Sequence, residues 1–143
     1  MKVLFLFIDG VGLRAAATDN PVNPEVCPAL CRLITKHGKP IDARLGIDGP
    51  PQSATGQATM FTGVNCASAM GKHCEGFPGP NLRKIIEADN LFKQLRDRGK
   101  EVCFSDAYLV DSAEELAARR FKSVTTVMAL TTPETIRTVD DLQ

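Results

Sequence analysis

The chain has 143 residues, 43% of them hydrophobic, which is enough for one ordinary domain with a hydrophobic core. Seventeen basic and seventeen acidic residues cancel to a formal net charge of zero. The basic excess typical of nucleic-acid-binding proteins is therefore absent, and nucleic acid is excluded as an expected partner.

The chain opens with a continuous apolar run over residues 3–8 that ends at Asp9. This run is too short to cross a bilayer, which takes roughly 20 residues, and no small-residue cleavage site follows it. Uninterrupted apolar runs of this length are typical of strands covered on both faces in a parallel sheet. We expect a soluble, cytoplasmic protein without membrane contact, with Asp9 at the carboxyl end of a buried strand.

A loop over residues 10–28 follows, and the next apolar spacing predicts a helix over 29–34, closed by Gly38. Residues 41–48 alternate between apolar and polar or small side chains, which predicts a half-exposed strand. That strand runs into the break Gly49-Pro50-Pro51, which leads to Ser53.

The second half of the chain begins with a weakly predicted helix from Ala54 to about Thr62, ended by Gly63. A loop over 64–80 and a short helix over 82–86 are expected after it. The next predicted elements are a helix capped by Asn90 and ended by Gly99, and a strand over 101–104. A capping box at Ser112 opens a helix that runs to about Arg120, and the end over 131–143 is expected to be poorly fixed.

Strands and helices alternate in this prediction, so the expected class is α/β. With its buried first strand, the chain is predicted to be a three-layer α/β/α sandwich with a mostly parallel sheet, incomplete relative to a full domain of that type.

Five cysteines form an odd set without a C-x-x-C pair: Cys27, Cys31, Cys66, Cys74 and Cys103. This argues against a disulfide framework and against a zinc ribbon. We expect small, buried hydrophobic side chains in a reducing compartment.

Two residues carry the chemistry that this organisation suggests. A serine hydroxyl needs a base or a metal ion before it attacks phosphorus. Asp9, at a strand end, is placed to anchor such an ion, and Ser53, before a predicted helix, is placed beside backbone N–H groups that bind anions. The plainer alternatives are that Ser53 only caps the helix and that Asp9 only closes a turn.

Further polar residues are candidates for contacting a substrate. His73 is flanked by Gly71 and Gly76, which would let it approach a bound substrate as a proton carrier or a phosphate contact; the alternative is a solvated loop histidine. Asp106 follows the predicted strand 101–104 and has the same ambiguity as Asp9.

The motifs together resemble the alkaline phosphatase superfamily, in the branch of cofactor-independent phosphoglycerate mutase and phosphopentomutase. The matching stretches are Phe7-Ile8-Asp9-Gly10-Val11-Gly12, Asp42-Ala43-Arg44-Leu45-Gly46, Pro51-Gln52-Ser53-Ala54-Thr55-Gly56-Gln57, Phe61-Thr62-Gly63-Val64-Asn65, Gly71-Lys72-His73, Gly76-Phe77-Pro78-Gly79-Pro80 and Phe104-Ser105-Asp106-Ala107-Tyr108.

This resemblance implies a site with two divalent metal ions, zinc, manganese or magnesium, and a small phosphorylated substrate. Asp9 matches an acidic metal ligand, and Ser53 matches the nucleophile that approaches the metals and becomes phosphorylated. Gln57 stands where the mutases carry a histidine, which counts against mutase activity proper; with His73 and Asp106 it is a candidate substrate contact.

The resemblance covers nearly the whole chain but only the opening half or so of the family's catalytic domain. The family's remaining aspartate and histidine ligands have no counterpart here, and one carboxylate with one hydroxyl makes a poor shell for a divalent ion. Three interpretations stay open: a metal-dependent phosphohydrolase or phosphotransferase incomplete in this chain alone, a catalytically inactive fragment, and a non-catalytic phosphate-binding or interaction module. An open sheet edge would then be covered by a C-terminal half or by a second copy.

Overall fold

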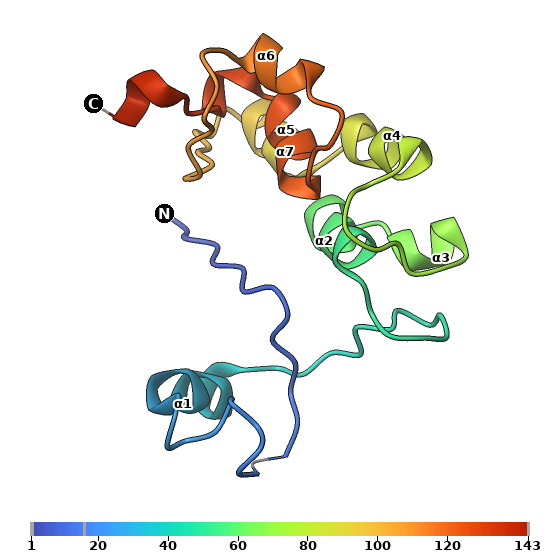
Figure 1. Cartoon of the computed structure of the whole chain (residues 1–143), viewed down its shortest axis with the longest axis vertical. Coiled ribbons are helices and arrows are strands. Elements are labelled where there is room, and N and C mark those ends of the chain that lie inside the picture. The colour runs from blue at the N-terminus through green and yellow to red at the C-terminus, as the bar shows by residue number, and fades with distance from the viewer. Residues whose placement is uncertain (1, 16, 143) are drawn as a thin grey trace. The chain divides into compact units, whose positions relative to one another are not determined.

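The computed structural model describes residues 2–15 and 17–142, which separate into two compact units, residues 1–42 and residues 43–143. Each unit is described by itself. Within the described residues all regular structure is helical, in seven α-helices and two short 3₁₀ helices (Figure 1).

The first unit contains one helix, α1 (Pro28–His37), flanked by long connecting segments. Pro28 occupies its first turn, where a missing N–H costs nothing, and the N–H of Gly38 bonds the Ile34 carbonyl to end it. A Cβ at Gly38 would lie 2.4 Å from that carbonyl oxygen, so the chain needs glycine here. The prediction of a helix closed by Gly38 is confirmed.

The second unit contains all other helices. They are α2 (Ser53–Thr62), α3 (Cys66–Met70), α4 (Pro80–Ala88), α5 (Leu91–Asp97), α6 (Ala113–Ala118) and α7 (Val124–Leu130), followed by η1 (Pro133–Thr135) and η2 (Val139–Leu142).

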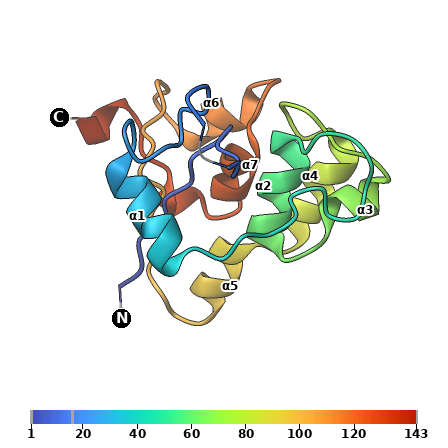
Figure 2. The ribbon, with the colours of Figure 1, turned by 90° about the horizontal axis from the view of Figure 1, so that it is seen from below.

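The core of the second unit lies between α2, α4 and α7, which pack against one another (Figure 2). Ala54 and Ala58 of α2 are completely buried, and their small side chains let the neighbouring helices come close. Leu82 and Ile86, one turn apart on α4, fill the space between α2 and α7. This core fixes the first turn of α2, on which Ser53 lies.

The predicted class, an α/β sandwich with a mostly parallel sheet, is wrong. The expected strands over 3–8, 41–48 and 101–104 are not strands in the structure, and the described residues contain one isolated parallel β-bridge, between Ala107 and Arg137. Apolar periodicity reports a preference for burial, whereas a sheet also needs neighbouring strands that form across long sequence separations. The described chain does not assemble such neighbours.

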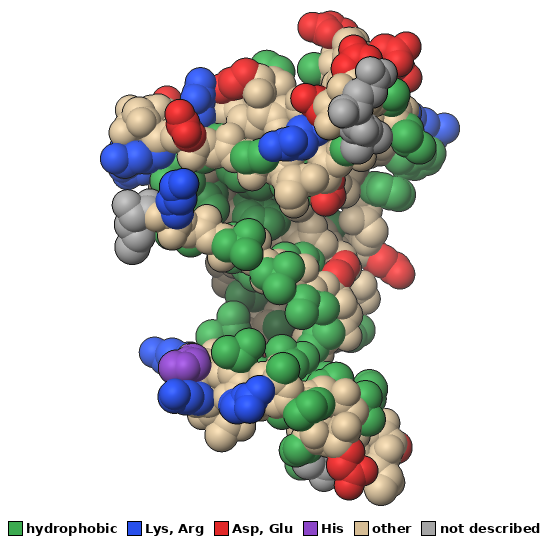
Figure 3. Space-filling model, turned by 90° about the vertical axis from the view of Figure 1, so that its left-hand side faces the viewer, with side chains coloured by type: hydrophobic (Ala, Val, Ile, Leu, Met, Phe, Trp, Pro, Cys, Tyr) green, Lys and Arg blue, Asp and Glu red, His purple; other side chains and the backbone are tan. Residues whose placement is uncertain are grey.

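The apolar run over residues 3–8 shows the consequence most clearly. Every one of its six side chains is exposed, and Leu4 keeps 91% of its surface in solvent. Hydrophobic side chains at the surface are also visible on the face drawn in Figure 3. The prediction that this run is buried is therefore wrong as well.

The helices agree much better with the sequence. The predicted helices over 54–62, 82–86, from Asn90 and from Ser112 are confirmed, with Gly63 in the left-handed conformation (φ 73°) that ends α2. Two helices were not predicted: α3, inside the expected loop 64–80, and α7. No helix among the described residues is long and apolar enough to span a bilayer.

The segment after α7 is better anchored than predicted. The N–H of Tyr108 donates to the carbonyl of Arg137, and the N–H of Val139 donates to that of Val110. Thr135 is buried. The prediction of a poorly fixed end is wrong as far as Val139; Gln143 lies outside the described residues.

Asn90 provides the sharpest test of this fold, because it is completely buried and uses its whole amide. Its Oδ1 accepts the N–H groups of Phe92 and Lys93, and its Nδ2 donates to the carbonyl of Ile86 and to Thr131 Oγ1. Asn90→Ala removes a helix cap and leaves the buried hydrogen-bond partners of Asn90 unsatisfied. It should therefore lower the free energy of unfolding by about 2–4 kcal/mol. Urea denaturation measures this, with exposed Asn81→Ala as control; equal stability of the two variants would contradict the packing described.

Candidate functional site

Ser53 is the first residue of α2, and the extended Gln52 before it occupies the N-cap position. The alternative in which Ser53 serves as the cap of this helix is therefore not the arrangement found. Ser53 is half-buried, and Gln57, one turn further along, is half-buried on the same side of α2. The structure thus brings two of the predicted site residues to one face of one helix.

The loop that carries His73 is tied to the first turn of α2. The Ala54 N–H donates to the Cys74 carbonyl at 3.2 Å, and the Cys74 N–H donates to Thr55 Oγ1 at 3.2 Å. Thr55 is completely buried, so this pair of bonds is shielded from water. His73, next to Cys74, is consequently held at the same end of α2 as Ser53.

His73 also contacts the segment that leads into Ser53. Its Nε2 lies 3.2 Å from the Ile47 carbonyl oxygen. Because a carbonyl only accepts, this contact is a hydrogen bond in which Nε2–H donates to Ile47. His73 is half-buried, so the alternative of a freely solvated loop histidine does not describe it.

A second side chain holds the same segment. Asn65 Nδ2 donates to the Leu45 carbonyl at 2.8 Å, while Asn65 Oδ1 caps α3. Leu45 has a φ of 56°, a left-handed conformation that costs free energy for a residue with a side chain. Two polar side chains, and not a β-ladder, thus position the stretch before Ser53.

Asp9 belongs to the first unit. It is exposed, and its Oδ1 accepts the N–H of Gly10 at 3.0 Å, in a turn where Gly10 has a φ of 72°. A cavity of about 360 Å³ lies directly after it, lined by Gly10 to Arg14 and Asp19 to Val22. The turn-closing alternative for Asp9 is thus present locally, and its convergence with Ser53 on one ion stays a prediction.

Asp106 is exposed and acts on Tyr108. Burial raises the pKa of the Tyr108 phenol above its ordinary value, the hydrogen bond with Thr126 Oγ1 opposes this, and the negative charge of Asp106 adds to the rise. Tyr108, two residues after Asp106, contacts Thr126 on α7, whereas Ser53 and Gln57 lie on α2 and His73 lies in the loop bonded to the first turn of α2.

No metal centre is formed by the residues that the structure describes, since none of their His, Cys, Asp and Glu side chains make a group of three or more able to hold an ion. The five cysteines are free thiols, and Cys66 is the buried one among them. A complete two-metal shell does not fit the described residues.

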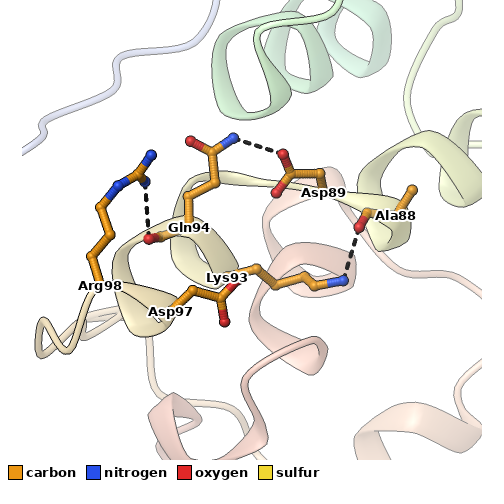
Figure 4. A pocket seen from close by; sticks show the side chains of 6 residues that line it. All are labelled: Ala88, Asp89, Lys93, Gln94, Asp97 and Arg98. Atoms are coloured by element: carbon orange, nitrogen blue, oxygen red, sulfur yellow. Dashed lines mark hydrogen bonds between the residues drawn. The ribbon is translucent and has the colours of Figure 1, made fainter.

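A depression of about 640 Å³ lies between the end of α4 and α5 (Figure 4). Its polar groups bond to one another: Gln94 donates to Asp89, and Lys93 to the Ala88 carbonyl. None of the predicted site residues lines it, so we do not assign the chemistry there.

Sequence reasoning missed the residues that assemble the start of α2, namely Thr55, Asn65 and the Cys74 backbone. Their contacts join positions 19 or 20 residues apart. No local sequence pattern indicates such contacts.

No family model, curated protein or solved structure matches this chain. The alkaline phosphatase resemblance therefore stays an expectation.

Thr55→Val tests the link between α2 and the His73 loop. The substitution keeps the shape of the side chain but removes the acceptor of the Cys74 N–H, so unfolding free energy should fall by about 1–3 kcal/mol. The Cys74 amide should also exchange faster with solvent, as read by hydrogen exchange. Thr55→Ser, which keeps the hydroxyl, should restore protection; unchanged exchange in Thr55→Val would contradict the link.

Tyr108 gives a prediction for the pH dependence, because it is the only tyrosine in the chain. Its folded-state pKa lies above 10.0, so the neutral phenol stabilises the fold fully below pH 10.0, and this contribution is lost as the pH rises through the folded-state pKa. Near-ultraviolet phenolate absorbance of the folded protein should therefore titrate above pH 10.0.

Two substitutions should move that titration in opposite directions. Asp106→Asn should lower the midpoint because it removes a negative charge, and Thr126→Val should raise it because it removes a hydrogen bond that favours the phenolate. Shifts of the same sign in both variants would contradict the arrangement around Tyr108.

Proposed function

We propose that residues 1–143 are the N-terminal portion of a metal-dependent phosphohydrolase or phosphotransferase acting on a small phosphorylated substrate. Ser53 is its nucleophile. The observation that carries the proposal is the environment of Ser53. This half-buried residue with a hydroxyl group lies on the first turn of α2, and the loop that contains His73 is hydrogen-bonded to that turn.

The reaction proceeds in two steps. Ser53 Oγ forms a bond to phosphorus while the bond from phosphorus to the ester oxygen breaks, and the serine proton leaves to a base, so that the released alcohol gains a proton in turn. Water, or an acceptor hydroxyl, then attacks the phosphoserine and regenerates Ser53. Because phosphoryl oxygens accept hydrogen bonds, the candidates for contacting the phosphoryl group are the N–H donors of His73 and of Gln57, which lies one turn along α2.

Divalent metal ions would supply charge neutralisation for the phosphoryl group and a lowered pKa for the serine hydroxyl. Asp9 is the carboxylate that this chain offers to such an ion. Because the described residues hold no complete shell, the remaining ligands in this proposal come from polypeptide outside residues 1–143, either a C-terminal half or a partner chain.

A non-catalytic phosphate-binding module is the alternative, and it would depend on the backbone N–H groups at the start of α2. One of those groups, the Ala54 N–H, already donates to the Cys74 carbonyl. This use of a donor favours the catalytic proposal over the binding module.

The test is turnover of an aryl phosphate by the protein in its native assembly, with manganese or zinc supplied. Ser53→Ala should reduce turnover at least ~1,000-fold, because loss of an activated nucleophile removes the covalent route. Ser68→Ala, which changes an exposed serine on α3, is the matched control and should leave turnover unchanged. Equal turnover by Ser53→Ala and the unaltered protein would refute the assignment.

A further inference from the structure

Two exposed phenylalanines touch each other on the second unit, where two connecting loops meet. Phe77 lies in the loop before α4, and Phe121 lies between α6 and α7. Their ring centroids are 5.4 Å apart at an interplanar angle of 38°, yet Phe77 is 54% exposed and Phe121 61% exposed. Aromatic side chains are mostly buried when packing is their only role, so an exposed ring pair points to an interaction surface.

Three basic side chains belong to the two loops of this ring pair or bond to their backbone. The guanidinium of Arg120 stacks over the Phe121 ring at 5.1 Å, and Arg83 donates to the carbonyls of Pro78 and Arg120, which joins the two loops. Lys122 bonds the carbonyls of Ala117 and Arg119 at the end of α6. We call the surface formed by Phe77, Arg83, Arg120, Phe121 and Lys122 the loop patch.

Within the described part of the chain, Arg83, Arg120 and Lys122 form no ion pair. Arg83 and Lys122 donate to neutral carbonyl oxygens, and Arg120 faces an aromatic ring, so these partners orient the cations without cancelling them. The neighbouring Arg119 is the member of this region with an acidic partner, Glu115 at 3.9 Å. The loop patch thus combines an apolar centre with three positive charges at its rim.

The arrangement resembles the anatomy of a protein interface, an aromatic centre with arginines around it. Single-stranded nucleic acid would need an open aromatic face for a base to stack on, but Arg120 lies over one face of the Phe121 ring and the Phe77 ring lies beside it. An aliphatic or aromatic side chain can instead pack against both ring edges while flanking carboxylates reach the cations.

We propose that the loop patch docks an acidic peptide segment of a partner protein, one that carries a large apolar side chain between carboxylates. The apolar side chain packs on Phe77 and Phe121, and the carboxylates pair with Arg83, Arg120 and Lys122. This docking surface is independent of the phosphoryl-transfer chemistry proposed for Ser53.

The experiment measures binding of a fluorescein-labelled peptide, Glu-Glu-Leu-Phe-Glu-Glu, to the full chain by fluorescence anisotropy. Phe121→Ala and Arg120→Glu should each weaken binding at least ~10-fold, the usual size of a central interface contact. The matched controls are Phe5→Ala and Arg98→Glu, exposed residues of the same types elsewhere in the chain, and they should bind as the unaltered protein does. Binding should also weaken as salt rises.

Several outcomes would overturn the proposal. One is absence of binding to the unaltered chain, and another is equal loss in the Arg98→Glu control. A third is tighter binding of Lys-Lys-Leu-Phe-Lys-Lys than of the acidic peptide. A fourth is preferential binding of a thymidine oligonucleotide that Phe121→Ala abolishes, which would assign the surface to nucleic acid. Circular dichroism of each variant excludes loss of fold as the cause.

Discussion

The candidate site depends on the reciprocal bonds between the first turn of α2 and the backbone of Cys74. The Ala54 N–H donates to the Cys74 carbonyl and Thr55 Oγ1 accepts the Cys74 N–H, in surroundings where Thr55 and Ala54 are completely buried. Buried pairs of this kind are costly to break, because each stranded group would be left without water. They hold the His73 loop and Ser53 at the same end of α2.

Side-chain hydrogen bonds position the segment before Ser53, which was predicted to be a strand held by a β-ladder. Asn65 and His73 bond the carbonyls of Leu45 and Ile47, and these contacts support the strained backbone at Leu45. The segment before Ser53 is therefore shaped by α3 and the loop after it. A substitution in α3 or in the loop after it should therefore alter the position of Ser53 through these contacts.

How well the sequence predicts an element depends on how far apart along the chain the residues that determine it lie. Caps at Asn90 and Ser112 and the stop at Gly63 act within one turn, and the helices they predict are confirmed. The run over residues 3–8 carries a strong apolar signal, but a sheet needs distant partners, and no short pattern states whether the chain supplies them.

The candidate site likewise depends on both local and long-range interactions. Ser53 was identified from its place before a predicted helix and Gln57 from the resemblance; the structure places them one turn apart on α2. His73 was identified as a candidate without a partner, because its contact with Ile47 spans 26 residues. Thr55, the residue that ties the site together, looks in sequence like any threonine of weak helix propensity. Asp9 was identified from its place at the end of a predicted strand, which the structure does not form, and from the resemblance.

The most direct measurement is the position of a trapped phosphoryl group. The protein in its native assembly is incubated with manganese and an aryl phosphate, quenched in acid and digested, and the phosphorylated peptide is sequenced by mass spectrometry. We predict phosphate on Ser53, since it is the hydroxyl that the start of α2 presents beside His73. Turnover accompanied by phosphate on another residue, or by none on Ser53, would contradict the account.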